Sequence, residues 1–171
     1  QIVFPNSPYL LISIAQKIDL INDLSRIKSQ AKSFDDRNAL NWVVSGRANA
    51  AVLPLSSCVD SLIEDPRLSV LLPQDGSPLN WTVIASPSLS PEHFPTDWFD
   101  SLWGATYLSR VINKGFLPPT NLSDLNRKYI NVPQKYQSIF LPEENVWKKC
   151  WSLPRLSFDR KKELALDWNN I

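Results

Sequence analysis

The sequence is poor in the residues that most catalytic and metal sites require. It contains one histidine, two cysteines, four glycines and no methionine. A structural zinc site needs four Cys or His ligands, and phosphate-binding loops need several glycines close together. A Ser–His–Asp triad would have to include His93, whose Pro-bounded segment is typical of a surface loop. We therefore predict no catalytic residue, no metal site and no cofactor.

The two cysteines allow at most one disulfide, and their spacing does not test it. Cys58 has an apolar neighbour in Val59, and Cys150 precedes Trp151. Buried free thiols are favoured, with a single Cys58–Cys150 bridge as the alternative.

Charge of one sign and long apolar runs are also missing. The formal net charge is +1, and the basic clusters 148–149 and 160–162 lie beside acidic residues, as on solvated helix faces. This balance excludes nucleic acid as an expected partner. No apolar run reaches the about 18 residues of a membrane span. With no leader and no initiator methionine, we expect a processed chain or a fragment.

What is present is the composition of a folded protein with short elements. The chain is 43% hydrophobic and 20% charged, with seven tryptophans and fourteen prolines. Residues 2–4 predict a strand. Ser7 as N-cap and Pro8 at the first helical position predict a helix that begins there. Further helices are expected after Asp19 as far as Phe34, and from a cap at Asp35 or Asp36 to Gly46.

The pattern then changes to that of strands. Ala48–Leu53 is nearly continuous apolar sequence, which predicts a central strand covered on both faces. Further strands are expected over 68–72 and 81–85, on either side of a turn at 74–78. Strands that alternate with helices predict an α/β fold with a mixed, largely parallel sheet flanked by helices.

The second half is mainly helical by the same criteria. A helix over 96–113 can break at Gly104 and ends at Gly115. Shorter helices are expected over 121–128 and 143–151. Ser157 or Asp159 caps a last helix, with Leu164, Trp168 and Ile171 on one face.

The order of several motifs resembles a family of bacterial extracellular solute-binding proteins. The helix that ends in Ser-Gly-Arg before Ala48–Pro54 is similar to the family's helix, turn and central strand. Residues 73–81 are similar to the "P-x-x-G-x-x-x-W" segment of its polyamine-binding branch, and 113–121 to that branch's "G-Y-x-P-x-N" turn. Pro142-Glu143-Glu144 and a Trp-bearing last helix complete the match. It covers nearly the whole chain, but only the C-terminal half of a typical member.

The resemblance implies a type 2 periplasmic-binding fold, in which two α/β lobes close on a ligand. Residues 1–80 and 125–171 would form the main lobe, and 81–124 the return segment of the second lobe. The resemblance also implies a set of ligand-binding positions. These are Ser7, Tyr9, Ser56, Ser57, Trp81 and Phe116.

Departures from the family pattern concern the ligand. The branch has a carboxylate at the start of the first helix, whereas residues 6–10 of this chain contain no acid. The branch has a second carboxylate two residues after the Trp, where this chain has Val83. Pro54-Leu55 replaces an aromatic residue. A buried ammonium group needs a carboxylate or strong acceptors, so a polyamine is not the expected ligand. Each of these residues also has a structural interpretation that needs no ligand. Trp81 would be a core residue, Phe116 the hydrophobic contact of a helix C-cap, and Ser56 or Ser57 a helix cap.

The function expected from the resemblance is non-catalytic. The chain would be the periplasmic solute-binding component of an ABC-type importer, with a small-molecule ligand and an ABC permease as partners. One alternative is a cytoplasmic regulatory effector domain of the same fold. Another is a protein-interaction module in which exposed tryptophans form a partner patch. An incomplete sheet predicts self-association, for example as a homodimer.

Overall fold

The computed structural model describes residues 1–83, 97, 101–117 and 132–171. These belong to two compact units. Unit 1 comprises Gln1–Cys58, Leu72–Asn80 and Glu144–Ile171, and unit 2 comprises Val59–Leu71 and Trp81–Glu143. Each unit is therefore assembled from separate stretches of chain. The predicted division into a main lobe (1–80 and 125–171) and a return segment (81–124) stays a prediction.

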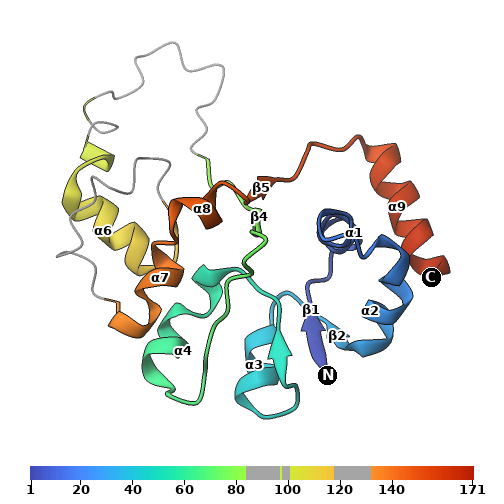
Figure 1. Cartoon of the computed structure of the whole chain (residues 1–171), viewed down its shortest axis with the longest axis horizontal. Helices are drawn as coiled ribbons and strands as arrows, with labels where there is room; N and C mark the ends of the chain where they lie inside the picture. Colours follow the sequence, from blue (N-terminus) through green and yellow to red (C-terminus); the bar gives the residue numbers. More distant parts are fainter. Residues whose placement is uncertain (84–96, 98–100, 118–131) are drawn as a thin grey trace. The chain divides into compact units, whose positions relative to one another are not determined.

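Unit 1 contains all the strands found in the described residues, and Figure 1 labels most of its helices and strands. Its first part runs β1 (Ile2–Phe4), α1 (Pro8–Lys17), η1 (Ile21–Asp23), α2 (Leu24–Gln30), β2 (Ala31–Phe34), α3 (Ala39–Val44), β3 (Ala50–Ala51) and η2 (Leu55–Ser57). Its later elements are β4 (Pro78–Leu79), α8 (Glu144–Trp147), β5 (Trp151–Ser152) and α9 (Phe158–Asn170). The predicted α/β class is thus confirmed at the level of a mixed helix-and-strand chain with a small parallel sheet.

The main sheet has the strand order β2-β1-β3, and both pairings are parallel. Val3 lies opposite Ser33 on one side and Ala51 on the other. The backbone N–H of Val52 extends the second pairing by donating to the Val3 carbonyl at 2.9 Å. The central strand is therefore β1. A separate parallel pair joins β4 to β5.

Both faces of this sheet are covered, as a parallel sheet requires. Successive residues of a strand point to opposite faces. Phe4 and Phe34 pack against a buried cluster from α1, α2 and α9, whereas Val3 packs with Ala39 of α3 and Ala48. In Figure 1, α1, α2 and α9 lie together on one side of β1 and α3 lies on the other.

Short-range signals set the ends of the main helices. Ser7 Oγ accepts a hydrogen bond from the Leu10 N–H, and Ser157 Oγ accepts one from the Arg160 N–H, both at 3.3 Å. These contacts confirm the predicted N-caps of α1 and α9. Gly46 ends α3 in the left-handed region, with φ of 70°, as predicted.

Several predictions about strands were wrong. Residues Ala31–Phe34 form β2 rather than the end of a helix, because pairing with β1 outweighs the helical spacing of Ala31 and Phe34. The strand predicted over 48–53 is only Ala50–Ala51, at the edge of the sheet, and Val52 is exposed. Neither 68–72 nor 81–83 is a strand.

The turn over 74–78 is confirmed, and it requires a glycine. Gly76 has φ of 90°, and its N–H donates to the Pro73 carbonyl at 3.1 Å. A Cβ at this position would overlap the carbonyl of Lys149 and lie 2.8 Å from the nitrogen of Cys150. Position 76 thus allows the turn to approach the chain just before β5.

Unit 2 is helical within its described residues. Its elements are α4 (Val59–Glu64), α6 (Ala105–Asn113), η5 (Gln134–Tyr136) and α7 (Gln137–Phe140). Phe140 and Ile112 are almost fully buried. Tyr136 is buried too, and its hydroxyl donates to the Leu68 carbonyl at 3.1 Å. The predicted break at Gly104 is confirmed, since α6 begins at the next residue. The predicted helix over 121–128 and residues 84–85 lie outside the described residues.

Candidate functional site

The carboxyl edge of the β2-β1-β3 sheet is the candidate site. In open α/β sheets, ligands bind outside the carboxyl ends of the strands, at the point where the strand order reverses. Here the chain passes from β1 to β2 by way of α1 and α2, and returns past β1 to β3 by way of α3 on the opposite face. The order 2-1-3 places that point between β1 and β3. The segments that leave these strands are 5–7 and 52–57.

On the β2 side, backbone and carboxylate hydrogen bonds close the edge. The N–H of Asn6 donates to Asp36 Oδ1 at 3.0 Å, and the N–H of Asp35 donates to the Phe4 carbonyl at 2.9 Å. Asp35 accepts from the N–H groups of Asn38 and Arg37, and these bonds, with Asn38 first, lower its pKa below the ordinary value. Both carboxylates therefore hold the loops of the protein itself.

Ser7 and Tyr9, which were predicted ligand residues, point to different surroundings. Ser7 lies at the carboxyl edge, where its hydroxyl caps α1 by accepting from Leu10. Tyr9 is two residues further on, in the first turn of α1, and its hydroxyl donates to the Pro154 carbonyl at 2.6 Å. Tyr9 therefore faces the segment between β5 and α9, away from Ser56 and Ser57.

Ser56 and Ser57 lie in η2, directly after β3, and not at the cap of α4 as one local reading had it. Ser57 is exposed and Ser56 is half-buried. Among the described residues, neither hydroxyl has a hydrogen-bond partner. Two hydroxyls without a hydrogen bond to the described residues thus follow the edge strand β3.

Cys58 follows these serines but does not supply a nucleophile. It is buried, and burial raises the pKa of its thiol to about 11. The thiol donates to the Leu55 carbonyl at 3.2 Å. A nucleophilic cysteine needs a lowered pKa, so this side chain is neutral and structural. Both cysteines are free thiols; Cys58 is buried, as predicted, whereas Cys150 is only half-buried.

Trp81 and Phe116, the two aromatic predictions, belong to unit 2. Trp81 is 59% exposed and Phe116 is 45% exposed. Phe116 follows Gly115 at the end of α6, and its N–H donates to the Val111 carbonyl at 3.1 Å. This is the backbone pattern of a glycine C-cap, as predicted for Gly115. The described carboxyl edge therefore consists of unit 1 residues only.

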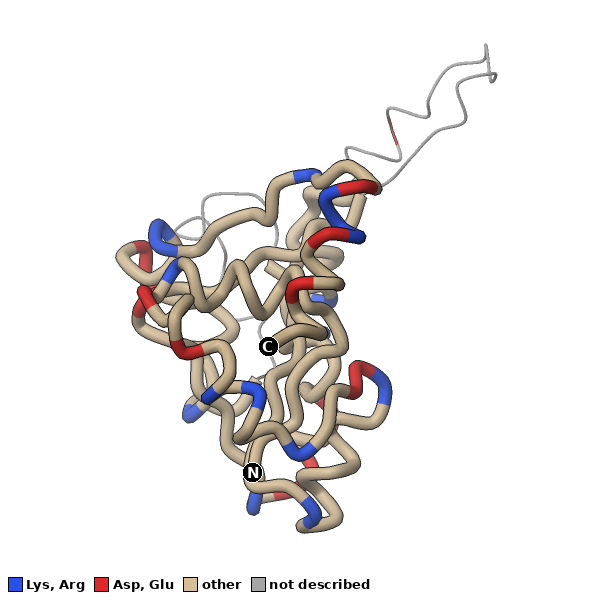
Figure 2. Tube along the Cα trace, turned by 90° about the vertical axis from the view of Figure 1, so that its right-hand side faces the viewer, with Lys and Arg blue, Asp and Glu red and all other residues tan. Residues whose placement is uncertain are grey.

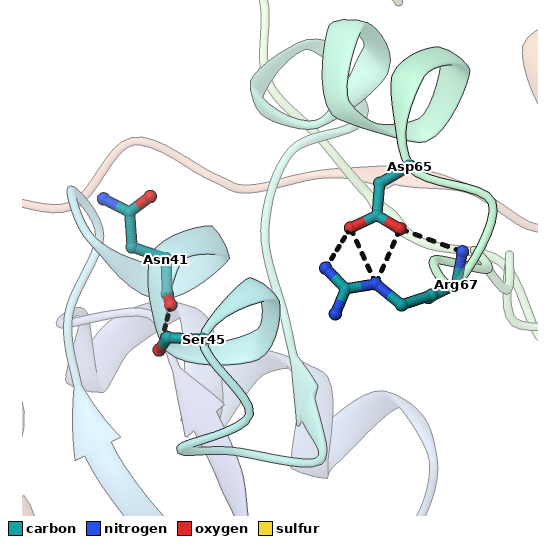
Figure 3. Close-up of polar contacts among 4 residues, drawn as sticks. All are labelled: Asn41, Ser45, Asp65 and Arg67. Carbon is teal, nitrogen blue, oxygen red and sulfur yellow. Dashed lines mark hydrogen bonds and ion pairs between the residues drawn. The ribbon is translucent and has the colours of Figure 1, made fainter.

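Charged groups elsewhere form local pairs. Asp65 and Arg67 form an ion pair at 2.6 Å, drawn in Figure 3, and the hydrogen bond from Arg67 lowers the Asp65 pKa to about 2. The same figure shows Ser45, whose hydroxyl donates to the Asn41 carbonyl at the end of α3. In Figure 2, stretches of Lys and Arg and stretches of Asp and Glu are both scattered along the described trace. In the described ranges, no group of three His, Cys, Asp or Glu residues could hold a metal ion.

Sequence reasoning missed the Asn6–Asp36 contact. Its signal was the presence of Asn and Asp just after neighbouring parallel strands, where loops meet at one edge.

His93 lies outside the described residues. Over the parts of the chain that the structure describes, no helix has the length and apolar character needed to cross a membrane.

In comparisons with known proteins, the chain matches no protein-family model, no curated protein and no solved structure.

Proposed function

We propose that this protein is a non-catalytic receptor for a small solute, of the kind that serves ABC-type importers, with a type 2 periplasmic-binding-like fold. The observation that carries the proposal is the parallel β2-β1-β3 order with helices on both faces. This order creates a carboxyl edge between β1 and β3, which is where open α/β sheets bind ligands. The receptor would act in the periplasm and deliver its ligand to a permease.

The assembly of each unit from several chain segments supports the same proposal. The chain passes between units at 58/59, 71/72, 80/81 and 143/144. Receptors that close two lobes around a ligand use such crossings as hinges, because a few residues absorb the change in backbone angles.

The groups at the carboxyl edge favour a polar or anionic ligand over a polyamine. The start of α1 presents the backbone N–H of Tyr9, since Pro8 has no N–H and that of Leu10 is bonded to Ser7 Oγ, and Ser56 and Ser57 present hydroxyls. The two acids nearby, Asp35 and Asp36, are already bonded to loop N–H groups. A polycation would find no uncommitted carboxylate among these residues, and an unpaired buried cation costs several kcal/mol.

A titration followed by ¹H–¹⁵N NMR tests the proposal. Inorganic phosphate, glycine, glutamate and spermidine are added separately to the full chain. We expect a saturable shift of the amides of Ser7, Tyr9, Leu10 and 55–58 with at least one polar or anionic probe, and none with spermidine. Ser56→Ala combined with Ser57→Ala should weaken that response, whereas Ser29→Ala, on the exposed side of α2, should not.

Two results would contradict the proposal. One is that no probe shifts the amide signals of residues at the carboxyl edge. The other is saturable binding of spermidine at that edge, which would overturn the argument from the committed carboxylates.

A second candidate function is a protein-interaction module, and exposed aromatic residues in unit 2 favour it. Trp103 and Tyr107, on either side of the start of α6, are 51% and 43% exposed. Tryptophan and tyrosine are enriched in interface hot spots. Light scattering of the full chain tests its simplest form, self-association. A concentration-dependent mass that Trp103→Ser abolishes would support it, and a monodisperse monomer would contradict it.

A regulatory effector domain of the same fold remains the alternative in the cytoplasm. It would use the same carboxyl edge, so the NMR titration does not separate it from an importer component. The gene sequence upstream of Gln1 does: a DNA-binding helix-turn-helix supports the effector, and a signal peptide supports the receptor.

A further inference from the structure

Unit 1 has an open groove that is separate from the carboxyl edge. It has a volume of about 420 Å³ and lies between α1, α9 and the segment that joins β5 to α9. Small-molecule sites usually occupy about 300–1,000 Å³, so this groove has room for one compact ligand.

Most of the groove wall is apolar. Ile12 of α1 and Leu164 of α9 belong to the buried cluster beneath it, and Leu156 packs against that cluster. Trp151 of β5 lines the groove as well. These side chains would contact the hydrocarbon or aromatic part of a ligand.

The polar part of the wall carries positive charge only. Lys17 and Arg160 line the groove, and the remaining polar lining comes from neutral side chains. Arg160 is paired with Glu163 at 2.6 Å. Within the described part of the chain, Lys17 has no ion pair, and its ammonium lies over the Trp151 ring, 5.7 Å from the centroid. One cation is therefore uncompensated at a largely apolar groove.

A hydrogen bond from a side chain to the backbone joins the two walls of the groove. The Tyr9 hydroxyl donates to the Pro154 carbonyl at 2.6 Å, which fixes the β5–α9 segment to α1. The two walls thus stay in place without a ligand, and less ordering is needed on binding.

We propose that this groove binds a small amphipathic carboxylate, whose carboxylate group pairs with Lys17 and whose apolar body lies on Ile12, Leu156 and Trp151. Charge complementarity selects the anion, and the apolar wall selects the hydrocarbon or aromatic body. The site goes beyond the proposed solute receptor, because its lining includes Tyr9 of the predicted ligand positions but not Ser7, Ser56 or Ser57.

The test compares three small molecules that share a phenylbutyl body and differ in the charge of the end group, by ¹H–¹⁵N NMR titration of the full chain. They are 4-phenylbutyrate, its neutral amide and 4-phenylbutylamine. We expect saturable shifts at the amides of 12–17 and the indole N–H of Trp151. The carboxylate should bind about fivefold more tightly than the amide, which corresponds to about 1 kcal/mol. The amine should bind most weakly.

Two exposed variants locate the charge. Lys17→Gln should remove the preference for carboxylate over amide, and Gln16→Glu should weaken carboxylate binding by placing an anion at the groove. Lys161→Gln on α9 is the matched control, because Lys161 does not line the groove. It should leave the fivefold preference unchanged.

The proposal is overturned if the amide binds as tightly as the carboxylate, or if Lys17→Gln and Lys161→Gln behave alike. It is also overturned if a capped acidic peptide binds more tightly than any carboxylate probe, since the groove would then serve a protein partner. Shifts confined to Ser7 and 55–58 would support the solute receptor and contradict this second site.

Discussion

Unit 1 and unit 2 differ in what holds their described elements together. Unit 1 has a parallel sheet whose two faces are covered by separate clusters, so its segments are tied by both hydrogen bonds and packing. Unit 2 has helices around Ile112, Tyr136 and Phe140, and several large side chains on its surface. In unit 1, the candidate binding site lies where parallel strands end at one edge of a sheet. In unit 2, exposed aromatic side chains are presented without a sheet.

The largest expected effect comes from opening a cavity in either unit. Phe140→Ala should destabilise unit 2 by about 3–5 kcal/mol, and Val3→Ala should destabilise unit 1 by about 2 kcal/mol, because both side chains are almost fully buried. Residue-resolved hydrogen exchange measures each effect. We expect each variant to lower protection mainly in its own unit. Equal loss of protection in both units would show that the two unfold as one.

The two glycines with positive φ in unit 1 give a matched pair. Gly76→Ala should cost about 3 kcal/mol, since its Cβ would collide with the Lys149 backbone and its φ is unfavourable for alanine. Gly46→Ala meets no atom within 4 Å and should cost only about 1 kcal/mol. Urea denaturation measures both. Equal costs would contradict the close approach of the turn to β5.

Loss of a helix cap should be smaller. Ser157→Ala removes the acceptor for the Arg160 N–H at the start of α9 and should cost about 1 kcal/mol. Ser29→Ala, whose hydroxyl bonds only to the Arg26 carbonyl in its own helix, is the control and should cost less than about 0.5 kcal/mol. Thermal unfolding compares them. A cost for Ser157→Ala no larger than the control would mean that α9 is held by Trp168 and Leu164 alone.

The smallest effect concerns the exposed ion pair of unit 2. The Arg67 side chain lowers the Asp65 pKa to about 2, so the pair stabilises the fold above the ordinary pKa of about 3.9 and this contribution is lost as the pH falls towards 2. Arg67→Gln should raise the Asp65 pKa towards 3.9 in an NMR pH titration, whereas Arg37→Gln should not. An unchanged Asp65 pKa in Arg67→Gln would show that the contact in Figure 3 does not persist in solution.

Local chemistry explains which parts of the fold could be predicted. The caps at Ser7 and Ser157 and the glycines at 46, 76 and 115 act within a few residues, so their patterns are visible in the sequence. Residues 31–34 are different, because their strand exists only through pairing with β1. The spacing of apolar residues along 31–34 therefore gives no information about the pairing of this segment with β1.

The candidate site stays a prediction. The family pattern pointed to Ser7, which caps α1 after β1, and to Ser56 with Ser57, which lie in η2 after β3. The groove was not predicted, because Lys17 and Trp151 come from opposite ends of the chain and meet only through tertiary packing. Their types alone carry no signal of that contact.

The parallel order β2-β1-β3 is the central claim, and nuclear Overhauser effects test it most directly. The structure predicts cross-strand contacts from Val3 to both Ser33 and Ala51, in parallel register, and slow exchange of the Val52 and Asp35 amide protons that bond to β1 carbonyls. Contacts in antiparallel register, or fast exchange of both amides, would contradict the sheet and the binding edge proposed from it.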